Sequence, residues 1–191
     1  MARVQWLGAV GDKPTVLIGD SLAVGLAVPL KEALAPEPFQ AFAKTGTTVA
    51  QWLASADLAT ALALTPKRVL VSLGTNDTKG KVPAATLKAQ VNELAVKIRG
   101  SGAEVVWLMP GKLPWEYPEL IAAVIAANAR TIDQPTVAKD DGIHPTGDGY
   151  KTWAASIKEQ LNPPTIATGA KQSIAPLLLI AAIVGVAWWV T

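Results

Sequence analysis

Three short blocks of the sequence hold a serine, an asparagine and the chain's single histidine, each close to a glycine and an aspartate. They are Gly-Asp-Ser-Leu at 19–22, Gly-Thr-Asn-Asp at 74–77 and Asp-Gly-Ile-His-Pro at 141–145. A serine hydroxyl becomes a good nucleophile when a histidine takes its proton, and a carboxylate can orient that histidine. An asparagine amide can donate a hydrogen bond to an oxygen that gains negative charge. The blocks therefore contain the groups that nucleophilic attack on a carbonyl requires.

Each of these residues also has an ordinary structural role. Ser21 stands where a helix N-cap is expected, and Asn76 follows a strand, where an Asx-turn is common. A lone histidine is often structural, and Asp141 and Thr146 are typical turn and cap residues. Asp141 nevertheless stands three residues before His144 in a glycine-containing turn, which can bring the two side chains together. Taken singly, the blocks leave both interpretations open.

The elements around the blocks indicate an α/β fold, because short apolar runs alternate with longer segments of helical spacing between residues 14 and 161. Strands are expected at 15–18, 39–43, 68–73 and 104–109, with a fifth near Thr136-Val137. Helices are expected at 23–34, 49–64, 84–99, 117–129 and 147–161. Continuous apolar runs such as Val69-Leu70-Val71 suit parallel strands that are covered on both faces. The prediction is a three-layer α/β/α sandwich around a five-stranded parallel sheet.

This fold would bring the blocks together. Each block lies at the carboxyl end of an expected strand or at the start of the next helix. In an open parallel sheet, ligands bind at the carboxyl ends of the strands. We therefore expect Ser21, Asn76 and His144 at the same edge of the sheet.

In this order and spacing, the blocks resemble those of the SGNH (GDSL) hydrolase family over about residues 14–161. The loop Lys44-Thr45-Gly46-Thr47-Thr48 corresponds to a further glycine block of that family, although its glycine has the alternative role of supplying a positive φ. The resemblance implies a flavodoxin-like fold. Ala23 rather than glycine stands two residues after Ser21, which distinguishes the block from the G-x-S-x-G elbow of α/β-hydrolases.

The resemblance also implies a role for each site residue. Ser21 would be the nucleophile, His144 the general base and then acid, and Asp141 the residue that orients His144. The oxyanion hole would comprise the backbone N–H groups of Ser21 and Gly46 and the side-chain amide of Asn76. Asp140 is a rival orienting carboxylate, and the family's spacing of three residues to the histidine favours Asp141.

Aromatic residues add a candidate for the substrate wall. Trp115 and Tyr117 lie in a loop after the fourth expected strand, so they either line the substrate site or pack the loop. Trp52, Trp107 and Trp153 fall in expected helices or strands, where their large apolar area predicts a place in the core.

Composition excludes several other classes of site. The chain has 191 residues, of which 50% are hydrophobic and 17% charged, so disorder of the whole chain is excluded. No cysteine and one histidine exclude a disulfide scaffold, a thiolate nucleophile and a histidine or cysteine metal cluster, and we expect no cofactor. A net charge of +2 without charge blocks argues against nucleic acid as a partner.

The C-terminal segment differs from the rest. We expect a hydrolase domain at 1–161, a linker at 162–173 and a hydrophobic helix at 174–190, a stretch of seventeen uncharged residues. As a helix it would be about 25 Å long, short for a hydrocarbon core of about 30 Å. Trp188-Trp189 fits an interfacial anchor, and Lys171 marks the less translocated side. The alternative is a helix that docks on another protein, for example in a virion.

The sequence thus predicts a serine esterase that acts on an acyl or acetyl ester and is tethered by its tail to a membrane or a larger assembly. The first residues lack the apolar run of a signal peptide, so the catalytic domain is expected on the cytoplasmic side. A second hypothesis is a membrane-associated structural or virion component that uses the hydrolase fold as a scaffold. A carbohydrate-binding module is disfavoured, because binding needs no nucleophile paired with a base.

Overall fold

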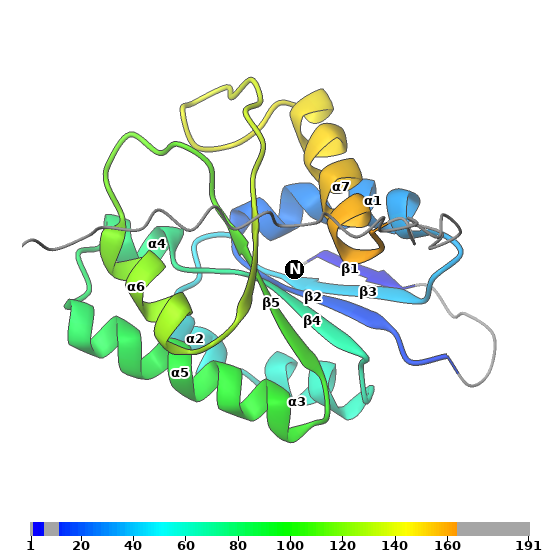
Figure 1. The fold of residues 1–191 in the computed structure, drawn as a ribbon, viewed down its shortest axis with the longest axis horizontal. Helices are drawn as coiled ribbons and strands as arrows, with labels where there is room; N and C mark the ends of the chain where they lie inside the picture. The colour runs from blue at the N-terminus through cyan, green and yellow to red at the C-terminus, as the bar shows by residue number, and fades with distance from the viewer. Residues whose placement is uncertain (1, 6–11, 164–191) are drawn as a thin grey trace, which may run out of the picture.

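A computed structural model describes residues 2–5 and 12–163 of the chain. A six-stranded sheet forms its centre, with strand order β1-β3-β2-β4-β5-β6 (Figure 1). The strands are β1 (Ala2–Gln5), β2 (Thr15–Gly19), β3 (Phe39–Ala43), β4 (Arg68–Ser72), β5 (Glu104–Met109) and β6 (Arg130–Asp133). Strands β2 to β6 are parallel, and β1 pairs antiparallel with β3 at one edge. The parallel part has the strand order of a doubly wound, flavodoxin-like sheet, as predicted.

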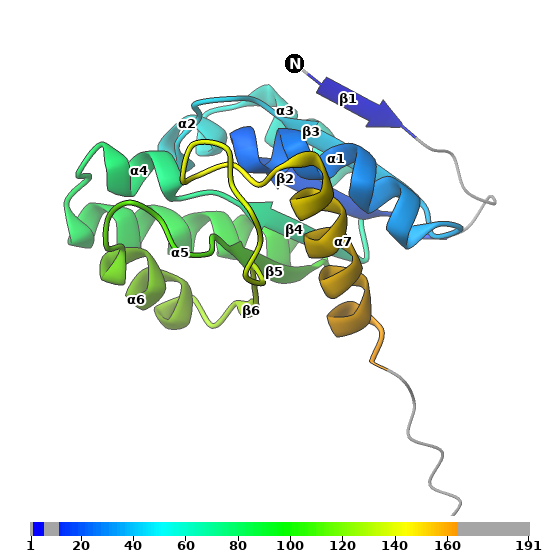
Figure 2. The same ribbon diagram turned by 90° about the horizontal axis from the view of Figure 1, so that it is seen from above.

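Helices cover both faces of the sheet. Helices α1 (Ser21–Leu34) and α7 (Gly147–Leu161) lie side by side on one face (Figures 1 and 2). The other face is covered by α2 (Val49–Leu53), α3 (Ala56–Ala63), α5 (Ala84–Gly100) and α6 (Pro118–Ala126). The short helix α4 (Thr75–Lys79) follows β4 directly, at the carboxyl end of that strand. The predicted α/β/α sandwich is therefore confirmed.

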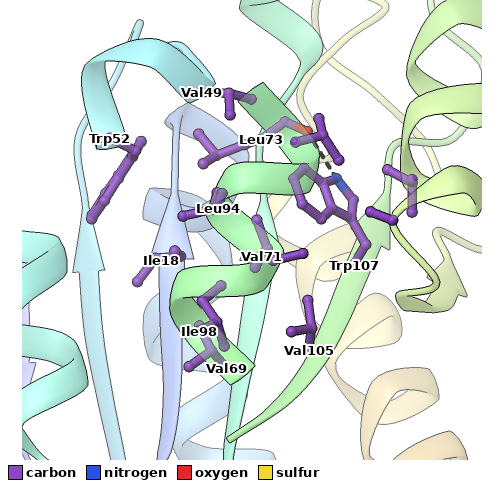
Figure 3. Close-up of a cluster of buried hydrophobic side chains, with 14 of the residues drawn as sticks. Ile18, Val49, Trp52, Val69, Val71, Leu73, Leu94, Ile98, Val105 and Trp107 are labelled. Atoms are coloured by element: carbon purple, nitrogen blue, oxygen red, sulfur yellow. Dashed lines mark hydrogen bonds between the residues drawn. The ribbon is translucent and has the colours of Figure 1, made fainter. Parts of the chain in front are cut away.

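The two faces bury separate apolar clusters because successive strand residues point to opposite sides. In β2, Val16 and Ile18 join the cluster under α2, α3, α5 and α6, whereas Leu17 joins the cluster under α1 and α7. In the first cluster, Trp107 is fully buried and its Nε1–H donates to the carbonyl of Leu73 at 3.1 Å (Figure 3). The indole is thus satisfied within the core. Trp52 and Trp153 are buried as well, so the prediction for these three tryptophans is confirmed.

Three predicted elements differ from the structure. The fifth parallel strand is β6, and the prediction of a strand near residues 136–137 is wrong. Because Ile132 is the one buried residue of β6, this strand has no apolar run in the sequence. The expected helix at 49–64 is two helices, because Ser55 caps α3 by accepting the Asp57 N–H at 3.1 Å. The expected helix at 117–129 ends at Ala126, which leaves room for β6 to begin at Arg130. Strand β1 and helix α4 were not predicted.

The predicted hydrophobic helix at 174–190 lies outside the described residues. Among the helices that the structure describes, none has both the length and the apolar character that a membrane span requires.

Candidate active site

Ser21 is the first residue of α1 and lies at the carboxyl end of β2. The helix is capped by the preceding residue, since Asp20 Oδ1 accepts the Leu22 N–H at 3.0 Å. The alternative interpretation of Ser21 as the N-cap is therefore wrong, and its hydroxyl is available for other contacts. A Cβ on Gly19 would lie 2.3 Å from the carbonyl oxygen of Ser72, so the close approach of β2 to β4 requires glycine here.

Ser21, His144 and Asp141 form a continuous chain of hydrogen bonds. His144 Nε2 lies 2.8 Å from Ser21 Oγ, and His144 Nδ1 lies 2.7 Å from Asp141 Oδ2. Because an ionised carboxylate can only accept, a neutral His144 ring places its proton on Nδ1 and turns the Nε2 lone pair toward the serine hydroxyl. The structure therefore joins residues 123 positions apart in the geometry that a general base and a nucleophile need.

The turn at 141–144 holds its carboxylate ionised. Asp141 Oδ1 accepts the backbone N–H groups of His144 at 2.7 Å and Ile143 at 2.9 Å. These bonds and the imidazole hold the pKa of Asp141 well below its ordinary value, with the His144 N–H as the largest cause. Gly142 has a φ of 78°, which a tight turn of this kind requires and glycine permits.

Asp140 takes a different part in the same loop. Its backbone N–H donates to the carbonyl of His144 at 3.1 Å, and it is the Asp141 carboxylate that meets the imidazole. Thr146 caps α7 by accepting the Gly149 N–H at 3.2 Å, as the cap interpretation of that residue predicted. The spacing argument that favoured Asp141 over Asp140 thus agrees with the geometry.

Asn76, in α4, connects two of the other loops at this edge. Its Nδ2 group donates to Asp20 Oδ2 at 3.2 Å and to the carbonyl of Thr47 at 3.0 Å. Both contacts lie outside its own loop, so the side chain does not form the simple Asx-turn that was the alternative. The amide nitrogen therefore sits between the residue before Ser21 and the residue after Gly46.

The loop that contains Gly46 is held in place by contacts of the residues that follow the glycine. Gly46 has a φ of 77°, so it supplies a positive φ whatever other role it has. Trp52 Nε1–H donates to Thr47 Oγ1 at 3.1 Å, and both oxygens of Asp77 lie 3.2 Å from the Val49 nitrogen. Gly46 also lines a cavity of about 230 Å³ together with Lys44, Thr45, Thr47, Gln51, Trp52, Ser55 and Asp57.

Two buried carboxylates, Asp20 and Asp77, are the site features that sequence reasoning missed. Both side chains are fully buried. Burial is the main cause that raises the pKa of Asp20 to about 7, with a further increase from Asp77 and an opposing effect from the Leu22 N–H. Burial also raises the pKa of Asp77, while the Val49 N–H lowers it. Their adjacency to Ser21 and Asn76 in the sequence was the available signal.

The two aromatic candidates for a substrate wall lie in different places. Trp115 lines a cavity of about 450 Å³ with residues at the end of α4, and its Nε1–H donates to Thr78 Oγ1 at 3.1 Å. Tyr117 donates its hydroxyl to the carbonyl of Pro110 at 2.7 Å and lines another cavity with Met109 and residues of α6. The structure therefore does not bring the two side chains to a common wall.

Comparisons with known proteins identify the family and the fold of the chain. The sequence profile of the GDSL-like lipase/acylhydrolase family matches residues 17–152, more than half of the chain. Among solved structures, a GDSL-like lipase from Bacteroides thetaiotaomicron has a TM-score of 0.62 and 20% identity, over 78% of this chain and 88% of that one. The psychrotrophic esterase EstA from Pseudoalteromonas sp., in a structure inhibited by monoethylphosphonate, has a TM-score of 0.61 and 19% identity, over 78% and 100%.

A third solved structure, TesA, has a TM-score of 0.64 and 21% identity, over 79% of this chain and 99% of that one. At these identities the likenesses show a shared fold. No curated protein sequence matches the chain.

Proposed function

Because the chain belongs to the GDSL-like lipase/acylhydrolase family, we propose that it is a serine esterase that cleaves an acyl or acetyl ester through an acyl-enzyme. The observation that carries the proposal is the position of His144, whose two ring nitrogens contact Ser21 Oγ and Asp141 Oδ2 at 2.8 and 2.7 Å. This arrangement of base and orienting carboxylate is the one that activates a serine for nucleophilic attack.

The first half of the reaction forms the acyl-enzyme. Ser21 Oγ attacks the ester carbonyl while its proton passes to His144 Nε2. The imidazolium that results is stabilised by Asp141, whose low pKa keeps it ionised. The tetrahedral intermediate then collapses, the bond to the leaving alcohol breaks, and His144 returns the proton to that alcohol.

The second half releases the acid. Water loses a proton to His144 and attacks the acyl carbonyl, and Ser21 leaves as the alcohol when the proton returns to its oxygen. In both halves the carbonyl oxygen becomes negative, and the N–H groups of Ser21 and Gly46 and the amide of Asn76 are the donors proposed for it. Loss of one such donor typically costs about 2.7 to 4 kcal/mol of transition-state stabilisation.

A fluorophosphonate probe tests the nucleophile. The full-length protein should be labelled at Ser21 at neutral pH, because a serine beside a base attacks phosphorus readily. Ser21→Ala should abolish labelling, whereas Ser55→Ala, which removes an N-cap serine of α3, should not. A folded wild type that resists the probe would contradict the esterase and favour the scaffold. The structure of EstA, inhibited by monoethylphosphonate, makes phosphonates a suitable class of reagent.

The preferred acyl group can be determined with substrates of graded size. A series of para-nitrophenyl esters of increasing chain length, measured beside acetylated sugars, separates an esterase for short acyl groups from a deacetylase for carbohydrates. A preference is read as a ratio of kcat/KM between two substrates.

The tail would tether the enzyme. The proposal rests on the seventeen uncharged residues at 174–190, and it places the catalytic domain on the Lys171 side. A chain cut after Pro164 should keep esterase activity on a soluble ester, because every proposed catalytic residue precedes the cut. The full-length protein should partition into liposomes and the shortened chain should not. Full-length protein that stays in the aqueous phase without detergent would contradict the membrane tether and favour docking on a protein.

A further inference from the structure

Asn76 holds its amide between the Thr47 carbonyl, which can only accept hydrogen bonds, and the Asp20 carboxyl group, which can only accept them once it has lost its proton, above a pKa of about 7. Its Nδ2 donates to the Asp20 carboxylate at 3.2 Å and to the Thr47 carbonyl at 3.0 Å. If the amide turned over while Asp20 is ionised, Oδ1 would face two acceptors and both hydrogen bonds would be lost. The two acceptors therefore determine which end of the Asn76 side chain faces this part of the site.

The position of these acceptors matches the proposed oxyanion hole. Asp20 is the residue before Ser21 and Thr47 is the residue after Gly46, so the two residues that accept from Asn76 are chain neighbours of the two residues proposed to offer backbone N–H groups. The two contacts therefore hold the Asn76 amide against the two loops in which those N–H groups lie. Asp20 itself is held by burial and by the Leu22 N–H, which bonds its other oxygen at 3.0 Å.

We propose that Asp20 is a positioning residue of the oxyanion hole, which acts by holding the donor end of Asn76 beside the N–H groups of Ser21 and Gly46. The inference rests on the proposed esterase function for the role of the oxyanion. The N–H that faces Asp20 makes the longer of the two bonds, and the developing oxyanion shares that proton during the reaction. Asp20 touches neither the substrate nor the reacting atoms.

The test is a double-mutant cycle of Asp20→Asn and Asn76→Ala, with kcat and KM measured on one para-nitrophenyl ester. In one orientation, the amide introduced by Asp20→Asn would place its NH₂ group against Asn76 Nδ2. In the other, the NH₂ group would face the Leu22 N–H. One of the two hydrogen bonds of Asp20 is therefore lost in either orientation. We expect Asn76→Ala to lower kcat by about 10²- to 10³-fold. Asp20→Asn should lower kcat by about tenfold or more with KM within about twofold, which is the signature of an interaction made in the transition state.

The double variant decides whether Asp20 acts through Asn76. If it does, the double variant should have a kcat within about threefold of Asn76→Ala alone, because the partner is already gone. Two losses that multiply would overturn the proposal. A higher kcat in Asp20→Asn would also overturn it, since Asp20 would then compete with the oxyanion.

Glu104→Gln is the control for loss of a carboxylate, because Glu104 begins β5 and so lies at the end of the sheet opposite the site. It removes a negative charge and keeps the length and shape of the side chain. Its kcat should stay within about threefold of wild type, since removal of a charge alone is not the cause we propose. A loss as large as that of Asp20→Asn would overturn the proposal.

Proton exchange in the wild type gives a readout that needs neither activity nor a folded Asp20 variant. The two side-chain amide protons of Asn76, assigned by their loss in Asn76→Ala, should exchange with solvent at least about tenfold more slowly than those of the exposed Asn92. Exchange at the same rate would overturn the positioning role. A wild type that shows this protection but neither hydrolyses esters nor reacts with the probe would contradict the proposed function instead.

Discussion

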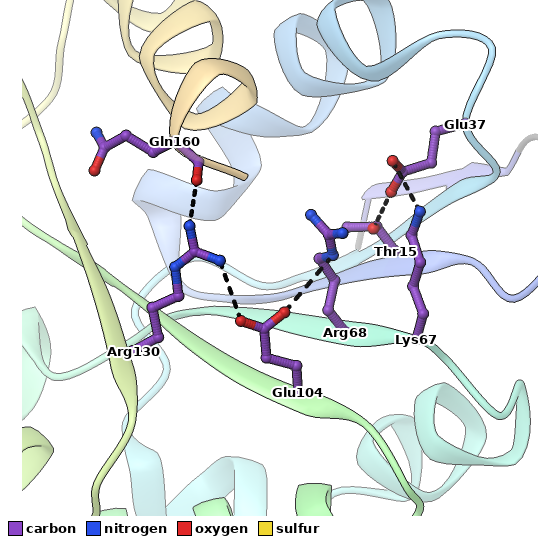
Figure 4. A network of polar contacts seen from close by, with 7 residues as sticks. All are labelled: Thr15, Glu37, Lys67, Arg68, Glu104, Arg130 and Gln160. Carbon is purple, nitrogen blue, oxygen red and sulfur yellow. Dashed lines mark hydrogen bonds and ion pairs between the residues drawn. The ribbon is translucent and has the colours of Figure 1, made fainter. Parts of the chain in front are cut away.

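Charged side chains have different partners and different burial at the two ends of the parallel strands. At the amino ends, charged groups lie near the surface and meet groups of opposite charge (Figure 4). At the carboxyl ends, two aspartates are fully buried near each other, and the contacts described above pair neither of them with a lysine or an arginine. The charges at the amino ends of the strands are therefore stabilised by opposite charges, whereas the two aspartates at the carboxyl ends have no such partner among these contacts.

At the amino ends, Glu104 is the centre of the contacts. It lies between Arg130, at 3.2 Å, and Arg68, at 4.0 Å, and these three residues begin β5, β6 and β4. Lys67 pairs with Glu37 at 3.0 Å, and Thr15 donates its hydroxyl to the same carboxylate. These contacts tie the starts of neighbouring strands together.

At the carboxyl ends, the buried side chains of Asp20 and Asp77 accept hydrogen bonds from uncharged donors. Asp20 accepts from Leu22 N–H and Asn76 Nδ2, and Asp77 accepts from Val49 N–H. These donors do not offset the cost of burial, since the pKa of both groups is raised. Such a cost is typical of sites where geometry matters more than stability. Substitutions at the carboxyl ends should therefore change activity most, and those at the amino ends should change stability alone.

The largest effect is expected for Asp141→Asn, which should lower kcat by about 10³- to 10⁴-fold with the fold intact. An asparagine keeps Oδ1 for the N–H groups of Ile143 and His144 but turns an NH₂ group toward the ring. His144 would then carry its proton on Nε2 and could not accept one from Ser21. Kinetics on a para-nitrophenyl ester, with a melting curve for each variant, measures both quantities.

Asp140→Asn is the control for that substitution, because it neutralises the neighbouring carboxylate and leaves the contact of Asp141 with the imidazole. It should change kcat by less than about tenfold. The reverse ranking of the two variants would assign the orienting role to Asp140.

The next effect concerns the dependence of stability on pH. The pKa of Asp20 rises from an ordinary 3.8 to about 7 on folding, so between these values the folded protein keeps a proton that the unfolded chain releases. Asp20 therefore favours the fold most below about pH 4, and this contribution is lost as pH rises to about 7. The change is on the order of 4 kcal/mol.

Urea unfolding of wild type and Asp20→Asn at several pH values tests this sign. The free energy of unfolding of the variant, relative to wild type, should increase from pH 4 to pH 7 and then level off, because asparagine does not titrate. His144 and Asp77 act on Asp20 and remain in both proteins. A constant difference between the two proteins over this range would contradict the raised pKa.

The sequence was sufficient to predict much of this sheet. The bounds of β2, β3, β4 and β5 agree with the prediction to within one residue, because buried parallel strands form continuous apolar runs. Strand β6 lies at the sheet edge with mainly exposed residues, so it lacks such a run. Strand β1 pairs antiparallel with β3, and that pairing joins residues about forty positions apart, which no local pattern encodes.

The sequence likewise predicts one part of the site and not another. The meeting of Ser21 with His144 follows from strand order, because each lies beyond the carboxyl end of a parallel strand. The roles of Asp20 and Thr47 do not follow, because they depend on how one amide, 56 positions from Asp20, is oriented in three dimensions. Tyr117 illustrates the same limit, since its hydroxyl turns to the carbonyl of Pro110 in its own loop.

The smallest effect is expected at the amino ends, for Glu104→Gln. The substitution leaves the Arg68 side chain, which is 13% exposed, without its anionic partner, and it also removes the ion pair with Arg130. Because Glu104 is itself 42% exposed, water screens much of the interaction, and we expect a loss of about 1 kcal/mol in the free energy of unfolding. The value of kcat should not change, since the substitution lies at the end of the sheet opposite the site. Glu93→Gln, which removes an exposed pair with Lys97 on α5, is the control and should cost less than about 0.5 kcal/mol. A fall in kcat for Glu104→Gln at unchanged fold would show that the two ends of the sheet are coupled, and the separation of stability from activity would then be wrong.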